Sequence, residues 1–227
     1  MKKFALVTGL VLCVAAGVWA ADVVVERAPA SPSIPEAPGY DNTQELKWDT
    51  GSATWMFVWY TGAGSWVGND FDVTTIKTYG GIKTYRTQSR LWPNNQWDGF
   101  RIGIYAMGGG VPGSMMWPTS GTPKFVMPSG SQYAWLDFDV GWVLPGAKKF
   151  LAAQEQFYNH PSPGADPYLV DNNTVNLLHS WQYYEGIWKP LENEKLYKNA
   201  MIRVIVDNEQ NPAVEPASVG RVKALYY

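Results

Sequence analysis

The sequence has few of the side chains that crosslink secreted proteins or bind metals. Its 227 residues include one cysteine, Cys13, and two histidines, His160 and His179. A single cysteine cannot form an intramolecular disulfide, so the fold must be stabilised by its core. The histidines lack the regular ligand spacing of a metal site, and neither lies beside a nucleophile motif such as G-x-S-x-G. We interpret both as hydrogen-bonded structural residues and predict no cofactor, no metal and no catalytic residue.

Three further absences exclude classes of partner. The chain has 18 basic and 20 acidic residues, a formal net charge of −2, which argues against binding to nucleic acid or to an anionic membrane. Gly108, Gly109 and Gly110 follow an expected strand, but Pro112 and the lack of a following helix remove the context of a phosphate-binding loop. After the first twenty residues no segment is apolar and long enough to span a membrane.

The first twenty residues have the pattern of a secretory signal peptide. Lys2 and Lys3 form a basic start, and residues 4–18 form an apolar run that is too short for a comfortable membrane span. Small residues at positions 18 and 20 suit cleavage before Ala21. We therefore predict an exported protein, at the cell surface or outside the cell, with the periplasm as an alternative.

Composition divides the rest of the chain into three parts. Four prolines at three-residue spacing, from Pro29 to Pro38, predict an extended linker over residues 21–44, unless this segment is a leader without a role. Residues 45–208 contain the strand patterns and form the predicted domain. Residues 209–227 form a polar linker and a basic, apolar tail. This tail resembles short C-terminal tails of other exported bacterial proteins, which implies a sorting or anchoring tag; a frayed end or an edge strand is the alternative.

Alternating apolar residues predict several strands with one buried face. Three segments show the pattern most clearly, and their expected inward residues are Ile102 and Ile104; Leu136, Phe138, Val140 and Trp142; and Ile202, Val204 and Val206. The opposite phase places Asp137, Asp139 and Arg203 on the outward side. Residues 55–61 are apolar on both faces and predict a central strand.

Two further segments complete the expected sheets. Residues 149–158, KFLAAQEQFY, suit a helix by propensity but follow a turn in a β-rich chain, and we predict a strand. Residues 179–184 and 187–191 flank Glu185-Gly186 as an expected hairpin. Eight or more short strands without a convincing helix describe an all-β, jelly-roll-like antiparallel β-sandwich, which the signal peptide and linker precede.

The order of these motifs resembles a known type of domain. The Trp-rich strand is followed by FRIGIY at 100–105, GGVPGS at 109–114, Asp171, HSW at 179–181, Gly186-x-Trp188 and MIR at 201–203. This order is similar to that of a recurrent jelly-roll-like domain of large exported bacterial proteins whose activities are not assigned, over roughly residues 45–208. The resemblance implies a β-sandwich on the cell exterior, and it provides no catalytic residues.

Acidic residues allow two weaker hypotheses. Asp137 and Asp139 share one strand face with Cα atoms about 6.5–7 Å apart, which is within the range of paired glycosidase carboxylates. Acids at this spacing are also ordinary on a solvent-facing strand, and no local apolar pocket is evident. Loop oxygens of the kind that bind structural calcium occur at Asp98, Asp166, Asp171, Asn172 and Asn173, but without an ordered Asp-x-Asp-x-Asp loop.

Tryptophan is the side chain that most suggests binding. Five of the twelve tryptophans lie in or beside expected loops: Trp92, Trp97, Trp117, Trp181 and Trp188. Flat rings with nearby Asn, Gln and Asp suit a sugar, whose apolar face stacks on the ring while its hydroxyls bind the polar side chains. The alternative is that these rings plug the ends of the sandwich, where loops need apolar cover.

We therefore predict an exported, non-enzymatic β-sandwich module for cell-surface attachment or assembly. Its expected partner is a surface polysaccharide or another envelope protein, and no nucleic acid. One alternative is a carbohydrate-binding module that uses the loop tryptophans. A further alternative is a carbohydrate-active enzyme of jelly-roll fold.

Overall fold

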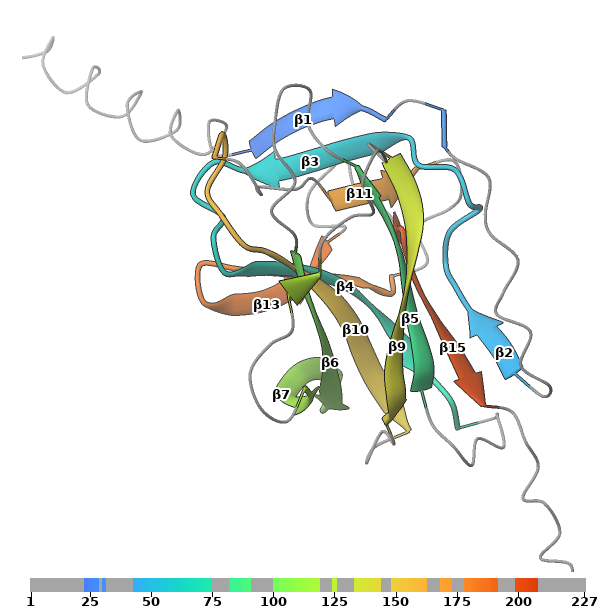
Figure 1. The fold of residues 1–227 in the computed structure, drawn as a ribbon. Helices are drawn as coiled ribbons and strands as arrows, with labels where there is room; N and C mark the ends of the chain where they lie inside the picture. The colour runs from blue at the N-terminus through green and yellow to red at the C-terminus, as the bar shows by residue number, and fades with distance from the viewer. Residues whose placement is uncertain are drawn as a thin grey trace, which may run out of the picture.

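The structure is a computed structural model that confirms an all-β, antiparallel architecture. It describes residues 23–28, 30–31, 43–74, 82–90, 100–118, 124–125, 133–143, 148–162, 168–172, 178–191 and 199–207. These residues form fifteen strands in three sheets, with antiparallel pairing throughout and no α-helix among them (Figure 1). The predicted signal peptide, residues 1–20, and the C-terminal segment 209–227 lie outside the described residues.

The largest sheet has seven strands and forms one layer of the sandwich. Its order is β13 (Ile187–Pro190), β12 (Ser180–Tyr184), β4 (Ser65–Asp72), β10 (Lys149–Gln156), β6 (Phe100–Gly108) and β7 (Val111–Trp117), with β8 (Lys124–Phe125) also paired to β6. The expected strand at 149–158 is therefore confirmed, and it is central: from Phe150 to Gln156 every residue is buried, since neighbouring strands and side chains cover both of its faces.

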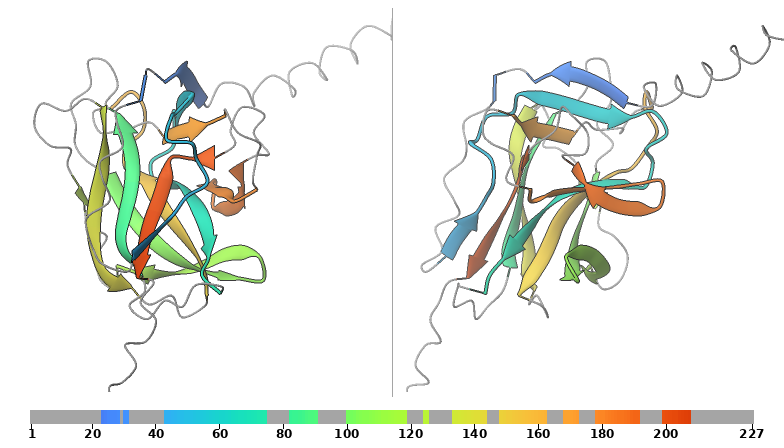
Figure 2. Two further views of the ribbon diagram at one scale, coloured as in Figure 1. Left: turned by 90° about the vertical axis from the view of Figure 1, so that its right-hand side faces the viewer. Right: turned by 180° about the vertical axis from the view of Figure 1, so that it is seen from behind.

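A four-stranded sheet forms the opposing layer. Its order is β2 (Thr43–Leu46), β15 (Ile202–Asp207), β5 (Ile82–Arg90) and β9 (Tyr133–Val143). Figure 2 shows β9, β5 and β15 side by side in this layer. A second four-stranded sheet covers one end of the sandwich, in the order β1 (Val23–Arg27), β3 (Trp55–Trp59), β11 (Tyr168–Asp171) and β14 (Asn199–Ala200).

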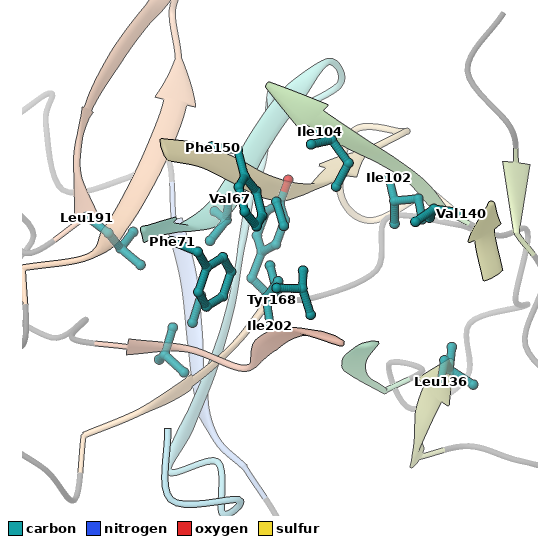
Figure 3. Close-up of a cluster of buried hydrophobic side chains, with 14 of the residues drawn as sticks. Val67, Phe71, Ile102, Ile104, Leu136, Val140, Phe150, Tyr168, Leu191 and Ile202 are labelled. Atoms are coloured by element: carbon teal, nitrogen blue, oxygen red, sulfur yellow. The ribbon is translucent and has the colours of Figure 1, made fainter. Parts of the chain in front are cut away.

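All three sheets contribute side chains to one hydrophobic core (Figure 3). Ile102 and Ile104 from β6 are fully buried, as is Val204 from β15, and Phe138 from β9 packs partly buried against them. The inward phase predicted for these strands is thus confirmed. The alternation does not indicate the third sheet, which adds Phe57 and other apolar side chains to the same core.

The linker interpretation of residues 21–44 does not hold for the two strands in that range. β1 pairs with β3 along its whole length, from Val23 opposite Trp59 to Arg27 opposite Trp55, and β2 pairs with β15. Val23 and Val25 pack against the core, so burial of apolar surface holds this segment in place despite the prolines that follow. Residues 32–42 lie outside the described part of the chain.

The outward, exposed position expected for Arg203 is also wrong. Its side chain is fully buried, and its Nε donates to Asp49 Oδ1 and Oδ2 at 3.2 and 3.0 Å. Its Nη1 donates to Glu45 at 3.0 Å, and its guanidinium lies 4.4 Å from the ring centroid of Trp135. A segment that contains Asp49 covers the outer face of β15, so both faces of this strand are buried.

Candidate functional site

The outer face of the seven-stranded sheet, turned away from the core, carries a cluster of aromatic side chains. Five rings from four strands form this cluster, called the aromatic face: Trp66, Tyr105, Trp181, Tyr183 and Trp188. They lie on the outer face because they alternate with inward residues such as Val67 and Ile104. Met107 and Met115 pack at the side of the cluster.

Strand register aligns three of these rings across the sheet. Tyr183 on β12 is directly opposite Trp188 on β13 and, on its other side, directly opposite Trp66 on β4. The ring centroids of Tyr183 and Trp188 are 5.2 Å apart, and Tyr105 contacts both Trp188 and Trp66 edge to face at 5.3 and 5.5 Å. These distances are typical of favourable aromatic pairs. These four rings therefore form one packed cluster, in which Trp66 and Tyr105 are buried and Tyr183 and Trp188 are the partly exposed members.

A row of small residues lies beside the rings. Gly68 on β4 and Gly103 on β6 are both opposite Ala153 on the strand between them. A Cβ at Gly68 would lie 2.5 Å from the carbonyl oxygen of Ala152, and one at Gly103 would lie 3.2 Å from the nearest Trp66 carbon. Only glycine allows this close approach of β4 to β10 at Gly68. Gly68 is thus an interior residue of β4.

Polar atoms on the aromatic face remain open to a ligand. Tyr183 and Trp188 are half-buried, whereas Trp66 and Tyr105 are 8% exposed. The indole nitrogens of Trp66 and Trp188 and the hydroxyls of Tyr105 and Tyr183 form no hydrogen bond with any described residue, and none is sealed from solvent. Burial, with a further contribution from the Glu155 carboxylate, raises the pKa of Tyr105, so its hydroxyl is a neutral donor.

Tyr183 also lines a pocket at the end of the sheet. The pocket has a volume of about 300 Å³, and its walls come from the β3–β4 turn and the β12–β13 hairpin: Thr61, Ala63, Gly64, Ser65, Tyr183, Tyr184, Glu185 and Gly186. Glu185 and Gly186 have φ values of 54° and 84°, so the expected hairpin at this position is confirmed. The hollow combines two phenol rings with hydroxyls and a carboxylate, and it is large enough for a small polar ligand.

A buried glutamine fixes one wall of this pocket. The Gln156 side chain accepts from Trp59 N at 3.0 Å and donates to Trp59 O at 2.7 Å, and its backbone oxygen accepts from Gly64 N at 2.8 Å. The hydroxyls of Thr61, from the β3–β4 turn, and Tyr184, from β12, lie 3.2 Å apart and connect the two walls. The pocket is therefore formed by the fold itself rather than by loose side chains.

The row of aromatic rings continues into a charged pair on the next two strands. Glu155 on β10 is opposite Trp66, and Arg101 on β6 is opposite Glu155. Arg101 Nη1 lies 3.5 Å from Glu155 Oε2, and its guanidinium carbon lies 4.0 Å from the ring centroid of Phe157. Burial raises the pKa of Glu155, and the neighbouring Arg101 partly opposes this shift.

A second polar cluster lies beside Trp181. Asp70 accepts from the Trp181 indole at 2.7 Å and is 2.6 Å from His179 Nδ1. The His179 ring stacks on Trp48 with centroids 3.9 Å apart, and Trp48 donates to the backbone oxygen of Asp70 at 2.7 Å. These contacts agree with the structural, hydrogen-bonded role expected for His179. The other histidine, His160, packs edge to face on Tyr60 at 5.4 Å, and burial lowers its pKa.

The structure places the five predicted tryptophans in different environments. Trp181 and Trp188 belong to the aromatic face and lie on β12 and β13, the two strands of the expected hairpin. Trp117 packs against the core on the opposite side of the sheet, as the structural alternative expects. Trp92 and Trp97 lie outside the described residues.

Three residues of the aromatic face are absent from the sequence prediction: Trp66, Tyr105 and Tyr183. Tyr105 could have been found, because it occupies the outward phase of a strand whose inward phase is clear. Trp66 precedes Gly68, which hides the strand pattern. Tyr183 lies in the expected hairpin, but only pairing with β4, more than 100 residues earlier, brings it to Trp66.

In the part of the chain that the structure describes, the geometry supports neither the paired carboxylates nor the calcium site considered from the sequence. Asp137 and Asp139 are exposed on β9, away from the aromatic face. Asp171 is fully buried and accepts two hydrogen bonds from Thr50, at 2.7 and 2.6 Å. Among the described residues, no group of three or more His, Cys, Asp or Glu is arranged to hold a metal ion. Within the same ranges, no helix has the length and hydropathy to cross a membrane.

Comparison with known proteins gives one informative similarity. No protein-family model matches this sequence, and no curated protein matches it. The fold is similar to a crystal structure of the cysteine protease and lectin-like domains of a surface layer associated protein of Clostridium difficile. The TM-score is 0.53 at 11% identity, and the match covers 76% of this chain and 37% of that one. At this identity, the similarity concerns the fold alone.

Proposed function

We propose that this protein is an exported, non-enzymatic surface module that attaches to polysaccharide through the aromatic face and the adjoining pocket. One observation carries the proposal: Trp188, Tyr183 and Trp66 are aligned by register across three strands and keep polar atoms open. Sugar rings have apolar C–H faces and hydroxyl rims, so they stack on such rings and bind such polar atoms. The pocket beyond Tyr183 then offers room for a further sugar or a chain end.

The structural neighbour supports this proposal without proving it. That protein is described as surface layer associated and as having a lectin-like domain. An antiparallel β fold on an exported protein agrees with a similar role here, and the predicted signal peptide agrees with a similar location. The same description also names a cysteine protease. This chain has Cys13 as its single cysteine, within the predicted signal peptide, so it offers no thiol nucleophile after cleavage.

A binding screen tests the proposal directly. The mature protein is applied to an array of bacterial and plant polysaccharides, and binding to at least one of them is expected. Trp188→Ala should then reduce binding at least tenfold, because the ring supplies stacking area and an open donor. Trp55→Ala is the matched control, since Trp55 is also a half-buried strand tryptophan but lies on β3, in the end sheet.

Two results would contradict the proposal. One is an array without any bound polysaccharide. The other is equal loss of binding in the Trp188 and Trp55 variants, which would trace the loss to general destabilisation. If another envelope protein binds the aromatic face in a Trp188-dependent way while no glycan does, the module serves assembly and the glycan assignment is wrong.

A further inference from the structure

Arg101 follows Glu155 in the aligned row, with Lys124 of β8 opposite it on the other side, and it has unused hydrogen-bonding capacity. A guanidinium carries five N–H donors, yet the described contacts of Arg101 comprise one long contact to Glu155 at 3.5 Å and the face of the Phe157 ring. Its Nε is buried without a hydrogen-bond partner. A buried donor without an acceptor is costly, so the described residues satisfy this guanidinium incompletely.

The exposure of the two partners is unequal. The side chain of Arg101 is 33% exposed and that of Glu155 is 9% exposed. The arginine is therefore the part of the pair that a ligand on the aromatic face reaches. Lys149, at the other side of the same face, is the contrasting cation: it lies 3.1 Å from Asp72 and is 63% exposed, as an ordinary surface ion pair.

We infer that the module selects polysaccharides that carry carboxylate groups, such as chains of uronic acids, and that Arg101 is the residue that recognises the carboxylate. This inference rests on the proposed function. A sugar chain that stacks on the half-buried rings of Trp188 and Tyr183 and follows the row passes the buried Trp66 and reaches Glu155 and Arg101. A planar guanidinium binds a carboxylate through two parallel hydrogen bonds, a geometry that a neutral sugar hydroxyl does not offer.

Glu155 has the opposite effect in this arrangement. Its carboxylate orients Arg101 but also competes with the ligand for the same donors and repels a second negative charge. Replacing it with glutamine keeps the shape and removes both effects. If the ion pair were purely structural, replacing either Arg101 or Glu155 would weaken binding. If Arg101 binds the ligand carboxylate, replacing Arg101 should lower the affinity for an acidic chain and replacing Glu155 should raise it.

The test compares each acidic polysaccharide with its own neutral form. Alginate, polygalacturonate and hyaluronan are used beside samples in which chemical reduction has converted the carboxylates to primary alcohols. For the wild-type protein, we expect at least one acidic chain to bind at least tenfold more tightly than its reduced form. Arg101→Gln should abolish this preference, Arg101→Lys should retain part of it, and Glu155→Gln should increase affinity for the acidic chain several-fold. Acetate at matched ionic strength should compete poorly, because it lacks the sugar rings.

Several outcomes would overturn the inference. Equal affinity for the acidic and the reduced chains would show that the protein does not recognise the carboxylate, although the proposal of glycan binding would still hold. A preference that survives Arg101→Gln would assign the carboxylate to another residue. Binding of no chain of either kind would instead contradict the proposed function. Circular dichroism and thermal melting verify the fold of each variant, and the reduction experiment needs no variant at all.

Discussion

Two arginines in this protein face carboxylates, and they differ in almost every other respect. Arg203 is fully buried, with contacts of 2.5–3.2 Å to Asp49 and Glu45 and the Trp135 ring centroid at 4.4 Å. Arg101 is one-third exposed, with one contact at 3.5 Å and a buried Nε that has no partner. Both stack on an aromatic ring, so the difference lies in how completely the carboxylates satisfy the guanidinium.

This difference separates a structural ion pair from one that can bind. A buried guanidinium with short, multiple contacts has no donor left for a ligand, and its partners cannot leave without stranding a charge in the interior. A guanidinium that is one-third exposed, with one long contact, is held less tightly by its carboxylate and keeps donors available. The same residue type therefore stabilises the fold in one sheet and marks a candidate recognition position on another.

The largest expected effect on stability comes from breaking the buried ion pairs of Arg203. Arg203→Ala should lower the free energy of unfolding by about 3–5 kcal/mol, since Asp49 would be left buried and unpaired. Arg101→Ala should cost less, because this pair has one contact at 3.5 Å and Arg101 is one-third exposed, although it leaves the buried Glu155 without its partner. Urea denaturation of both variants measures the difference. Similar losses would show that the two pairs do not differ in the way described.

The next effect concerns the packing under the aromatic face. Gly68→Ala should destabilise the protein by roughly 1–3 kcal/mol, because the added Cβ would meet the β10 backbone at 2.5 Å. It should also weaken glycan binding by displacing β4 and Trp66. Gly113→Ala on β7 is the matched control, since its Cβ would have ordinary contact at 3.4 Å and should change the midpoint little. Equal midpoints in denaturant would show that β4 and β10 have more freedom to separate than their contacts indicate.

The smallest expected effect is a pH dependence of stability that arises from Glu155, the partner of Arg101. Because burial raises the pKa of Glu155 in the folded state, the native protein takes up this proton at a higher pH than the unfolded chain does. The contribution of Glu155 to stability therefore increases as pH falls through its folded-state pKa and levels off below its unfolded value. The wild type should gain stability relative to Glu155→Gln between pH 7 and pH 4, as measured by thermal melting at each pH. A difference that does not change with pH would place Glu155 in a more solvated setting.

Local patterns in the sequence predict many of the strands but few of the residues of the aromatic face. Period-2 alternation identifies β6 and β15 and the buried side of each, because one covered face is enough to produce it. Alternation does not reveal whether a second layer covers the other face, which is why Arg203 was expected outside. The aromatic face depends on register between strands far apart in the chain, as between Trp66 and Tyr183. No local signal encodes such pairing.

The row of small residues beside the rings affects the thermodynamics of binding. Because Gly68 and Gly103 let rings and neighbouring strands approach the backbone closely, the stacking surface is part of the sheet rather than a set of free rotamers. Little conformational entropy would then be lost when a sugar chain settles on it, apart from the chain's own. Calorimetry should attribute most of the unfavourable entropy to the polysaccharide, so that shorter or stiffer chains bind with a smaller entropic penalty on an unchanged protein surface.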